Sequence, residues 1–263
     1  MTKDIFTKII FGAIIFLIGL TLAVPLIVGN DFFFPFIFPK ALTFRVLVEV
    51  IFVLYFLLAY LSPEFRPKFN WLFGLLAGFI TVAFVAAIFG INFYTSFWGD
   101  IERSEGLILW LHLLAYFLVL ISVLREKHWL WLFNYSLIIG LIVSLQALAQ
   151  AFNLGFINSG GSRVTAMFGN ASFLAAYMIF QLALAAFLFL KRQEMLYRII
   201  YALLGFLYIF VIINTQTRGA FMGLVAAALV GGALLIFYRS ADKRIKIAKI
   251  VYVSLIILTG VSI

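Results

Sequence analysis

The sequence contains no cysteine, which excludes disulfide frameworks, thiolate nucleophiles and cysteine-based metal sites. Charged residues are also scarce, at 11% of the 263 residues, whereas a soluble domain carries about 25%. There is no Walker loop, no GxGxxG dinucleotide motif and no metal-ligand spacing of acidic or histidine residues. We therefore expect neither a cofactor nor a metal, and a surface that faces an apolar medium.

Most of the sequence consists of long apolar runs. Hydrophobic residues make up 66% of the chain, and the mean hydropathy is +1.19. About 20 apolar residues cross a hydrocarbon core of about 30 Å as a helix, and lipid cannot hydrogen-bond open backbone. The sequence thus predicts an all-α polytopic transmembrane helix bundle, with residues 1–263 forming one transmembrane domain. About nine crossings are expected, at 9–28, 41–61, 71–91, 106–124, 129–151, 168–190, 196–214, 219–237 and 247–263.

The distribution of basic residues predicts the orientation. The net charge of +9 is spread over short loops, so the positive-inside rule explains it better than nucleic-acid binding does. With a cytoplasmic N-terminus, five of the 19 basic residues lie on the outer side. The last run stops at Ile263, barely long enough to cross. We therefore expect the chain to be the N-terminal part of a longer protein.

The five outer cations lie before or just inside helices that enter the membrane from outside. A cation at a helix N-terminus is unfavourable by a few tenths to about 1 kcal/mol. The arrangement becomes reasonable if the cations and the helix N-termini bind one anion, such as a phosphate group. The alternative is that these side chains reach lipid headgroups and have no further role. The five are Lys40, Arg45, Arg103, Arg163 and Arg218.

Arg218 is the strongest of these candidates. It follows a short polar turn, 214–217, between two long apolar runs, and an arginine near hydrocarbon depth is usually retained for a role. Thr217 can cap the helix that begins there, and Gly219 lets a ligand approach the backbone.

The remaining ionisable residues have structural interpretations. Glu49 stands four residues after Arg45 and is expected to pair with it. Glu105 belongs to the acidic loop 100–106, which could supply a general base or bind an acceptor, although loop carboxylates are more often solvated. His112 is expected to make a helix-packing hydrogen bond, and His128 lies at the cytoplasmic end of its helix.

Four stretches resemble the O-antigen ligase and O-antigen polymerase family of bacterial inner-membrane proteins. Each is weak alone, but their order and their placement on the outer face make the resemblance moderately specific. They are 38–40 with 45–49, then 96–98 with 103–106, then 163–170, and finally 217–220.

The resemblance implies transfer or polymerisation of a glycan from a polyprenyl-diphosphate carrier to a glycan, lipid or protein acceptor, without a metal. The location implied is the outer face of the bacterial cytoplasmic membrane. Arg218 and Arg163 match the diphosphate-binding arginines of the family. Lys40, Arg45 and Arg103 are further candidates, and Glu105, Asn170, Thr217 and Gly219 are secondary ones.

The family's catalytic histidine lies in a large outer loop, which would begin beyond Ile263, so we expect the chain alone to be inactive. The alternative function is a transporter or flippase for an anionic lipid-linked substrate. Transporters usually carry charged or broken helices near the membrane midplane, whereas the polar residues here are expected at one face.

Overall fold

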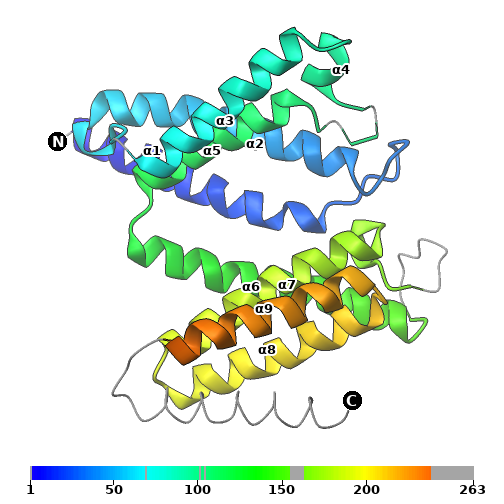
Figure 1. Ribbon diagram of the computed structural model, residues 1–263. Coiled ribbons are helices and arrows are strands. Elements are labelled where there is room, and N and C mark those ends of the chain that lie inside the picture. The colour runs from blue at the N-terminus through cyan, green and yellow to red at the C-terminus, as the bar shows by residue number, and fades with distance from the viewer. Residues whose placement is uncertain (1, 69, 101, 104, 155–162, 238–263) are drawn as a thin grey trace.

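Long helices run back and forth through the molecule and are joined by short loops (Figure 1). The computed structural model describes residues 2–68, 70–100, 102, 103, 105–154 and 163–237, and these form helices and no strand. The α-helices are α1 (Thr2–Ala23), α2 (Phe38–Leu61), α3 (Trp71–Ile88), α4 (Phe93–Trp98), α5 (Leu107–Val123), α6 (Glu126–Ala151), α7 (Ala171–Lys191), α8 (Met195–Asn214) and α9 (Arg218–Phe237). Three short 3-10 helices join them: η1 (Val24–Leu26), η2 (Pro63–Phe65) and η3 (Ala166–Phe168).

Within the described ranges, six helices are long and apolar enough to cross a membrane: α1, extended through η1, and α2, α3, α6, α7 and α8. Two shorter apolar helices, α5 and the part of α9 up to Leu234, occupy two further expected crossings. The all-helical prediction is therefore confirmed for the described residues, and six of their helices are candidates to span a membrane. The ninth expected crossing, 247–263, lies outside the described residues.

Several helix boundaries differ from the sequence prediction for local physical reasons. α1 begins at Thr2 rather than residue 9, and it ends at Ala23 because Pro25 follows. α3 ends at Ile88, and the short helix α4, which the sequence did not predict, follows it. α7 begins after Asn170, whose side chain accepts the N–H of Ser172 and so caps the helix.

The helices form two groups, which Figure 1 shows one above the other. The N-terminal helix group comprises α1 to α5, and its core is built from α1, α2, α5 and η2. The C-terminal helix group comprises α6 to α9, and its core lies among α6, α7 and α8. The two groups meet where α1 packs on α6 and η1 on η3. At this contact a Cβ on Gly19 would lie 3.3 Å from the ring of Trp131.

Hydrogen bonds between helices hold the C-terminal helix group together. The Gln181 side chain of α7 donates to the Ser136 hydroxyl of α6 at 3.0 Å, and the Tyr208 hydroxyl of α8 donates to the Leu137 carbonyl oxygen at 2.9 Å. A Cβ on Gly140 would lie 3.0 Å from both Gln181 and Tyr208. A small residue at a close helix crossing with polar partners is typical of packing in lipid, where apolar burial alone does not drive helices together.

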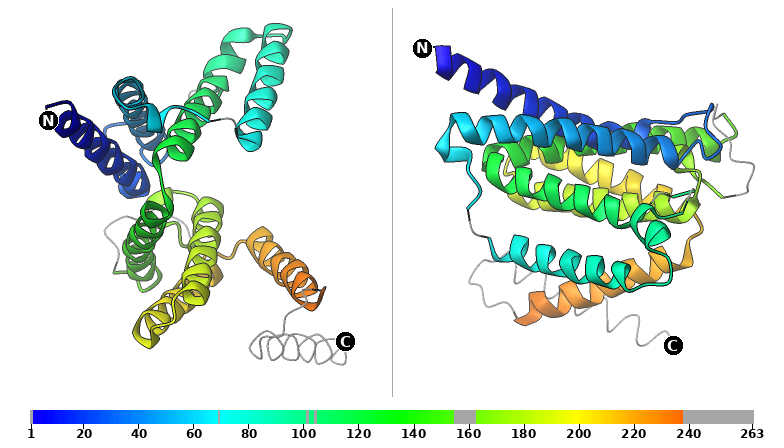
Figure 2. Two further views of the ribbon diagram at one scale, coloured as in Figure 1. Left: turned by 90° about the vertical axis from the view of Figure 1, so that its left-hand side faces the viewer. Right: turned by 90° about the horizontal axis from the view of Figure 1, so that it is seen from above.

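The alternating helix directions bring the loops to two ends of the bundle (Figure 2). The N-terminal end contains the start of α1, the α2–α3 loop and the α5–α6 junction. The far end contains the loops after α1, α4, α6 and α8. Because α2, α5, α7 and α9 all start at the far end, the five predicted outer cations lie there, on or before those helices.

Candidate functional site

The far end is built around the segment 163–170, which links α6 to α7. The side chain of Gln150 holds this segment, because its Oε1 accepts the backbone N–H groups of Thr165 at 2.9 Å and Ala166 at 2.8 Å. Ala166 has a φ of 45°, which is unfavourable for a residue with a Cβ. Gly169 has a φ of 65°, and a Cβ there would lie 2.5 Å from the ring of Phe36. The segment is therefore seated tightly against the loop before α2.

Lys40 connects the two helix groups. Its Nζ donates to three backbone carbonyl oxygens, of Ile27 at 2.6 Å, Phe36 at 2.8 Å and Met167 at 2.8 Å. An ammonium group has three N–H donors, so these carbonyls use all of them. Lys40 would thus contribute its positive charge to an anion site, while its hydrogen bonds hold the fold.

A cavity of about 450 Å³ lies beside Lys40, between α2 and α5 of the N-terminal helix group and η3 and α7 of the C-terminal helix group. Arg103 and Glu105 also line it, and the guanidinium of Arg103 lies 5.9 Å from the centre of the Phe173 ring. One part of the lining is therefore charged and most of the rest is apolar. The apolar lining includes Phe36, Phe44, Leu109, Leu113, Phe168 and Phe173.

Arg163 has a different position, at the turn between α8 and α9. Its Nε donates to the carbonyl oxygen of Thr215 at 2.8 Å, and its Nη2 donates to the hydroxyl of Thr217 at 2.7 Å. The Thr217 hydroxyl in turn donates to the Thr215 carbonyl at 3.3 Å. Gln216, between them, has a φ of 49°. Arg163 therefore fixes the turn from which α9 starts.

Arg218 is the first residue of α9, as the sequence predicted, and it is exposed. Within the part of the chain that the structure describes, its side chain makes no hydrogen bond or ion pair. Gly219 is exposed too, and a Cβ there would meet nothing within 4 Å. This helix start therefore presents a guanidinium and open backbone to its surroundings.

Four of the five predicted cations thus form two sets rather than one cluster. Lys40 and Arg103 share the cavity, whereas Arg163 and Arg218 lie at the α8–α9 turn, and segment 163–170 joins the two sets. Arg45 lies further along α2, within electrostatic range of Glu49. Of the secondary candidates, Glu105 lines the cavity, Thr217 and Gly219 lie beside Arg218, and Asn170 caps α7.

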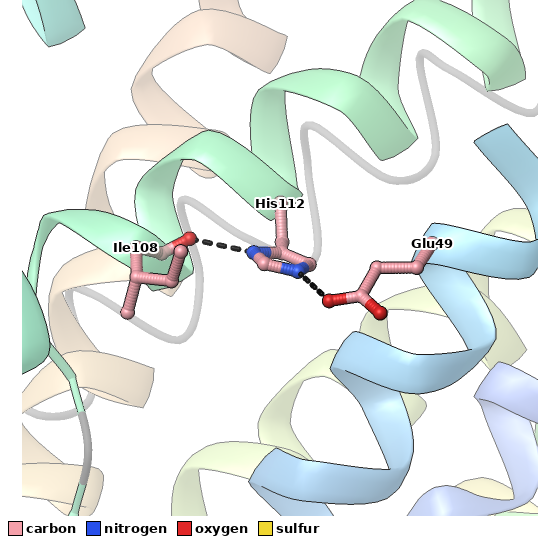
Figure 3. Close-up of polar contacts among 3 residues, drawn as sticks. All are labelled: Glu49, Ile108 and His112. Carbon is pink, nitrogen blue, oxygen red and sulfur yellow. Dashed lines mark hydrogen bonds and ion pairs between the residues drawn. The ribbon is translucent and has the colours of Figure 1, made fainter. Parts of the chain in front are cut away.

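A second polar site lies between α2 and α5 of the N-terminal helix group (Figure 3). His112 of α5 points toward Glu49 of α2, with 3.0 Å between Nε2 and the carboxylate Oε1. The Nδ1 of His112 lies 2.7 Å from the carbonyl oxygen of Ile108. The expected packing hydrogen bond of His112 is confirmed, but the sequence did not reveal Glu49 as its partner. The signal in the sequence that could have indicated this partner is the presence of one ionisable residue within each of two apolar helices.

The hydrogen bonds of His112 determine how many protons the pair holds. The Ile108 carbonyl can only accept, so Nδ1 carries a hydrogen and donates it. The contact between Nε2 and Glu49 then needs a proton as well, on Nε2 as an imidazolium or on Glu49 as a carboxylic acid. Both forms have zero net charge. This neutrality suits Glu49, which lies half-way along α2 with 64% of its side chain exposed.

No protein-family model, curated protein or solved structure matches this chain. Conclusions about its activity therefore depend on the residues and geometry described above.

Replacing Lys40 by Met is expected to destabilise the protein strongly. The substitution leaves three carbonyl oxygens without their charged donor, and hydrogen bonds to charged groups contribute about 1.5–3 kcal/mol each. Allowing for partial rearrangement, we expect the free energy of unfolding in detergent to fall by about 2–4 kcal/mol. Arg103→Met, at the same end but exposed, is the control and should change it by less than about 0.5 kcal/mol. Equal effects of the two variants would contradict the role of Lys40.

The Glu49–His112 contact predicts a difference between two substitutions of Glu49. Glu49→Gln keeps the contact, because the Gln amide can donate to the unprotonated Nε2 of a neutral imidazole. Glu49→Leu removes it and leaves the largely buried Nε2 unpartnered, at a cost of about 1–2 kcal/mol. Thermal unfolding in detergent should therefore rank wild type and Glu49→Gln close together and Glu49→Leu well below them. A Leu variant as stable as the Gln variant would show that the contact contributes nothing.

Proposed function

We propose that this chain belongs to a membrane enzyme that transfers or polymerises a glycan from a polyprenyl-diphosphate carrier onto an acceptor. The reaction takes place at the outer face of the bacterial cytoplasmic membrane. The chain crosses that membrane about nine times, with its N-terminus in the cytoplasm and its far end outside. This function is the one implied by the resemblance to O-antigen ligases and polymerases.

The observation that carries the proposal is the state of Arg218. Lys40 and Arg163 donate hydrogen bonds to backbone and threonine oxygens. Arg218, in contrast, is exposed and makes no hydrogen bond or ion pair with the described residues. It stands at the N-terminus of α9, where free N–H groups and the helix dipole favour an anion. A guanidinium there can form two parallel hydrogen bonds to a phosphate.

The shape of the far-end cavity is consistent with a lipid-linked donor. Its aromatic and aliphatic walls suit a prenyl chain, while Lys40 and Arg103 place positive charge beside those walls. The cavity is about 450 Å³, within the range of ordinary ligand pockets. It can hold part of such a lipid near the membrane surface, with the diphosphate directed toward the cations.

The chemistry that the cations supply is electrostatic. When the glycosyl bond breaks, negative charge gathers on the leaving diphosphate. Guanidinium groups already held in place stabilise that charge without reorganising at the moment of reaction. Arg163 is held in this way by Thr215 and Thr217, and it keeps further N–H groups of its guanidinium available to a ligand.

The Glu49–His112 pair favours a second candidate, a transporter or flippase for an anionic lipid-linked substrate. Ionisable residues half-way along spanning helices are common in transport proteins, which bind protons or ions there. The sequence had placed the polar residues at one face only, and this pair departs from that expectation. Movement of labelled carrier lipid between the leaflets of proteoliposomes would distinguish transport from glycan transfer.

Substitution of Arg218 by Ala in the intact gene is expected to reduce glycan transfer by at least about a hundredfold, because it removes a charge-stabilising donor. The measurement is the amount of acceptor-linked glycan in cells that carry only the variant. Arg192→Ala, at the N-terminal end, is the matched control and should transfer normally. Both variants should reach the membrane in equal amounts.

Normal transfer by the Arg218 variant would contradict the glycan-transfer proposal. Loss of carrier-lipid movement in that variant, with no transfer activity in the wild type, would support the transporter instead.

The orientation can be tested because the chain has no cysteine. A single cysteine can replace Lys68, in the α2–α3 loop, or Glu102, between α4 and α5. These two positions lie at opposite ends of the bundle. In intact cells, a membrane-impermeant thiol reagent should label the Glu102→Cys variant only. Labelling of the Lys68→Cys variant alone would reverse the orientation.

A further inference from the structure

The N-terminal end of the bundle has two recesses, at a distance from the far-end cavity. One of about 360 Å³ lies among the α2–α3 loop, the start of α3 and the end of α5. The other, of about 210 Å³, lies among the start of α1, η2 and the start of α6. The two share Glu64, Phe65 and Arg125, so one wall separates them.

Positive charge dominates both recesses. Glu64 is the only carboxylate among the described residues that line them, and it pairs with Arg125 at 3.1 Å. No other carboxylate faces the remaining cations across these linings. The basic residues that line one or both recesses are Lys8, Arg66, Lys68, Arg125 and Lys127. Lys8, Lys68 and Lys127 make no hydrogen bond or ion pair with the described part of the protein, so their charge is available to an anion.

One polar group at the wall of the larger recess lacks a partner among the described residues. Ser122 lines it, and its buried hydroxyl forms no hydrogen bond with the described residues. Asn70 lines it as well and caps α3 by accepting the N–H groups of Leu72 and Phe73. The recess therefore combines an unpartnered buried hydroxyl with several cations, which together suit a phosphate group.

The surroundings of this recess indicate a phosphate that is attached to a lipid. α2 and α3 are joined by the loop that lines the recess, but α2 packs mainly on α1 and then on α5, whereas α3 packs mainly on α5. Among the six candidate spans, α3 has the smallest share of buried residues, at 11%. Trp71, Leu72 and Leu75, in its first turns, are exposed by 54–76%. An acyl chain can lie along this apolar surface while its headgroup occupies the recess, with Trp71 at the membrane interface.

We propose that the recesses at the N-terminal end bind the phosphate headgroup of an anionic phospholipid from the adjacent leaflet. Basic pockets between spanning helices at the cytoplasmic surface suit such headgroups. The Arg125–Glu64 pair divides the site, so phosphate groups on its two sides contact different sets of cations. This inference is independent of glycan transfer, because it uses none of the far-end residues.

The test is native mass spectrometry of the purified chain after exchange into mixed phosphatidylcholine and phosphatidylglycerol. The wild type is expected to retain phosphatidylglycerol in clear preference to phosphatidylcholine. The double variant Arg66→Gln, Lys68→Gln should lower that retention about tenfold, because each cation near a bilayer contributes to anionic-lipid binding. Lys68→Gln alone replaces an exposed residue and should lower it about threefold, so the test remains decisive if the double variant does not fold.

The matched control for Lys68→Gln is Arg192→Gln, which leaves the Lys191–Glu126 ion pair intact. It removes the same charge at the same end, from the α7–α8 junction outside both recesses. This control should retain phosphatidylglycerol nearly as the wild type does. Equal losses in the control and the recess variant would mean general surface attraction and would overturn the site. Displacement of phosphatidylglycerol by millimolar inorganic phosphate would overturn the lipid assignment and indicate a free-phosphate site.

Discussion

The contact between the Lys40 ammonium and three backbone carbonyls is the interaction on which the far end depends. One acceptor follows α1, one precedes α2, and the third belongs to η3 in the C-terminal helix group. Lipid provides no water to satisfy such carbonyls, so the lysine fulfils a need that the irregular backbone creates. Its position determines where segment 163–170 lies, and that segment carries Arg163 to the start of α9. Lys40 and Gln150 together thus hold the segment that connects the cavity to the α8–α9 turn.

Much of the helical architecture follows from the sequence because each spanning helix is a long local apolar run. For example, the start of α9 at Arg218 was predicted because a short polar turn between two such runs marks the boundary. Local signals also explain the errors. The polar residues at the start of α1 hid its first turns, and a run of apolar residues through 88–91 hid the break before α4.

The site was less predictable because its contacts join distant parts of the chain. The sequence indicated which cations lie at the far end, but the acceptor Met167 is 127 residues from Lys40. Likewise, Gln150 holds Ala166 in a conformation that its own sequence disfavours. The sequence therefore placed 168–170 in the crossing 168–190 rather than in this irregular segment. The division of the cations into two sets could not be derived from helix order alone.

The neutrality of the Glu49–His112 pair has a consequence for the protein in an energised membrane. A transmembrane voltage does work on net charge that moves along the field. Transfer of the shared proton between Nε2 and Oε1 moves charge over no more than their 3.0 Å separation, and the pair as a whole stays uncharged. An electric field therefore does little work on this proton. Its position should be the same in a polarised and in a depolarised cell.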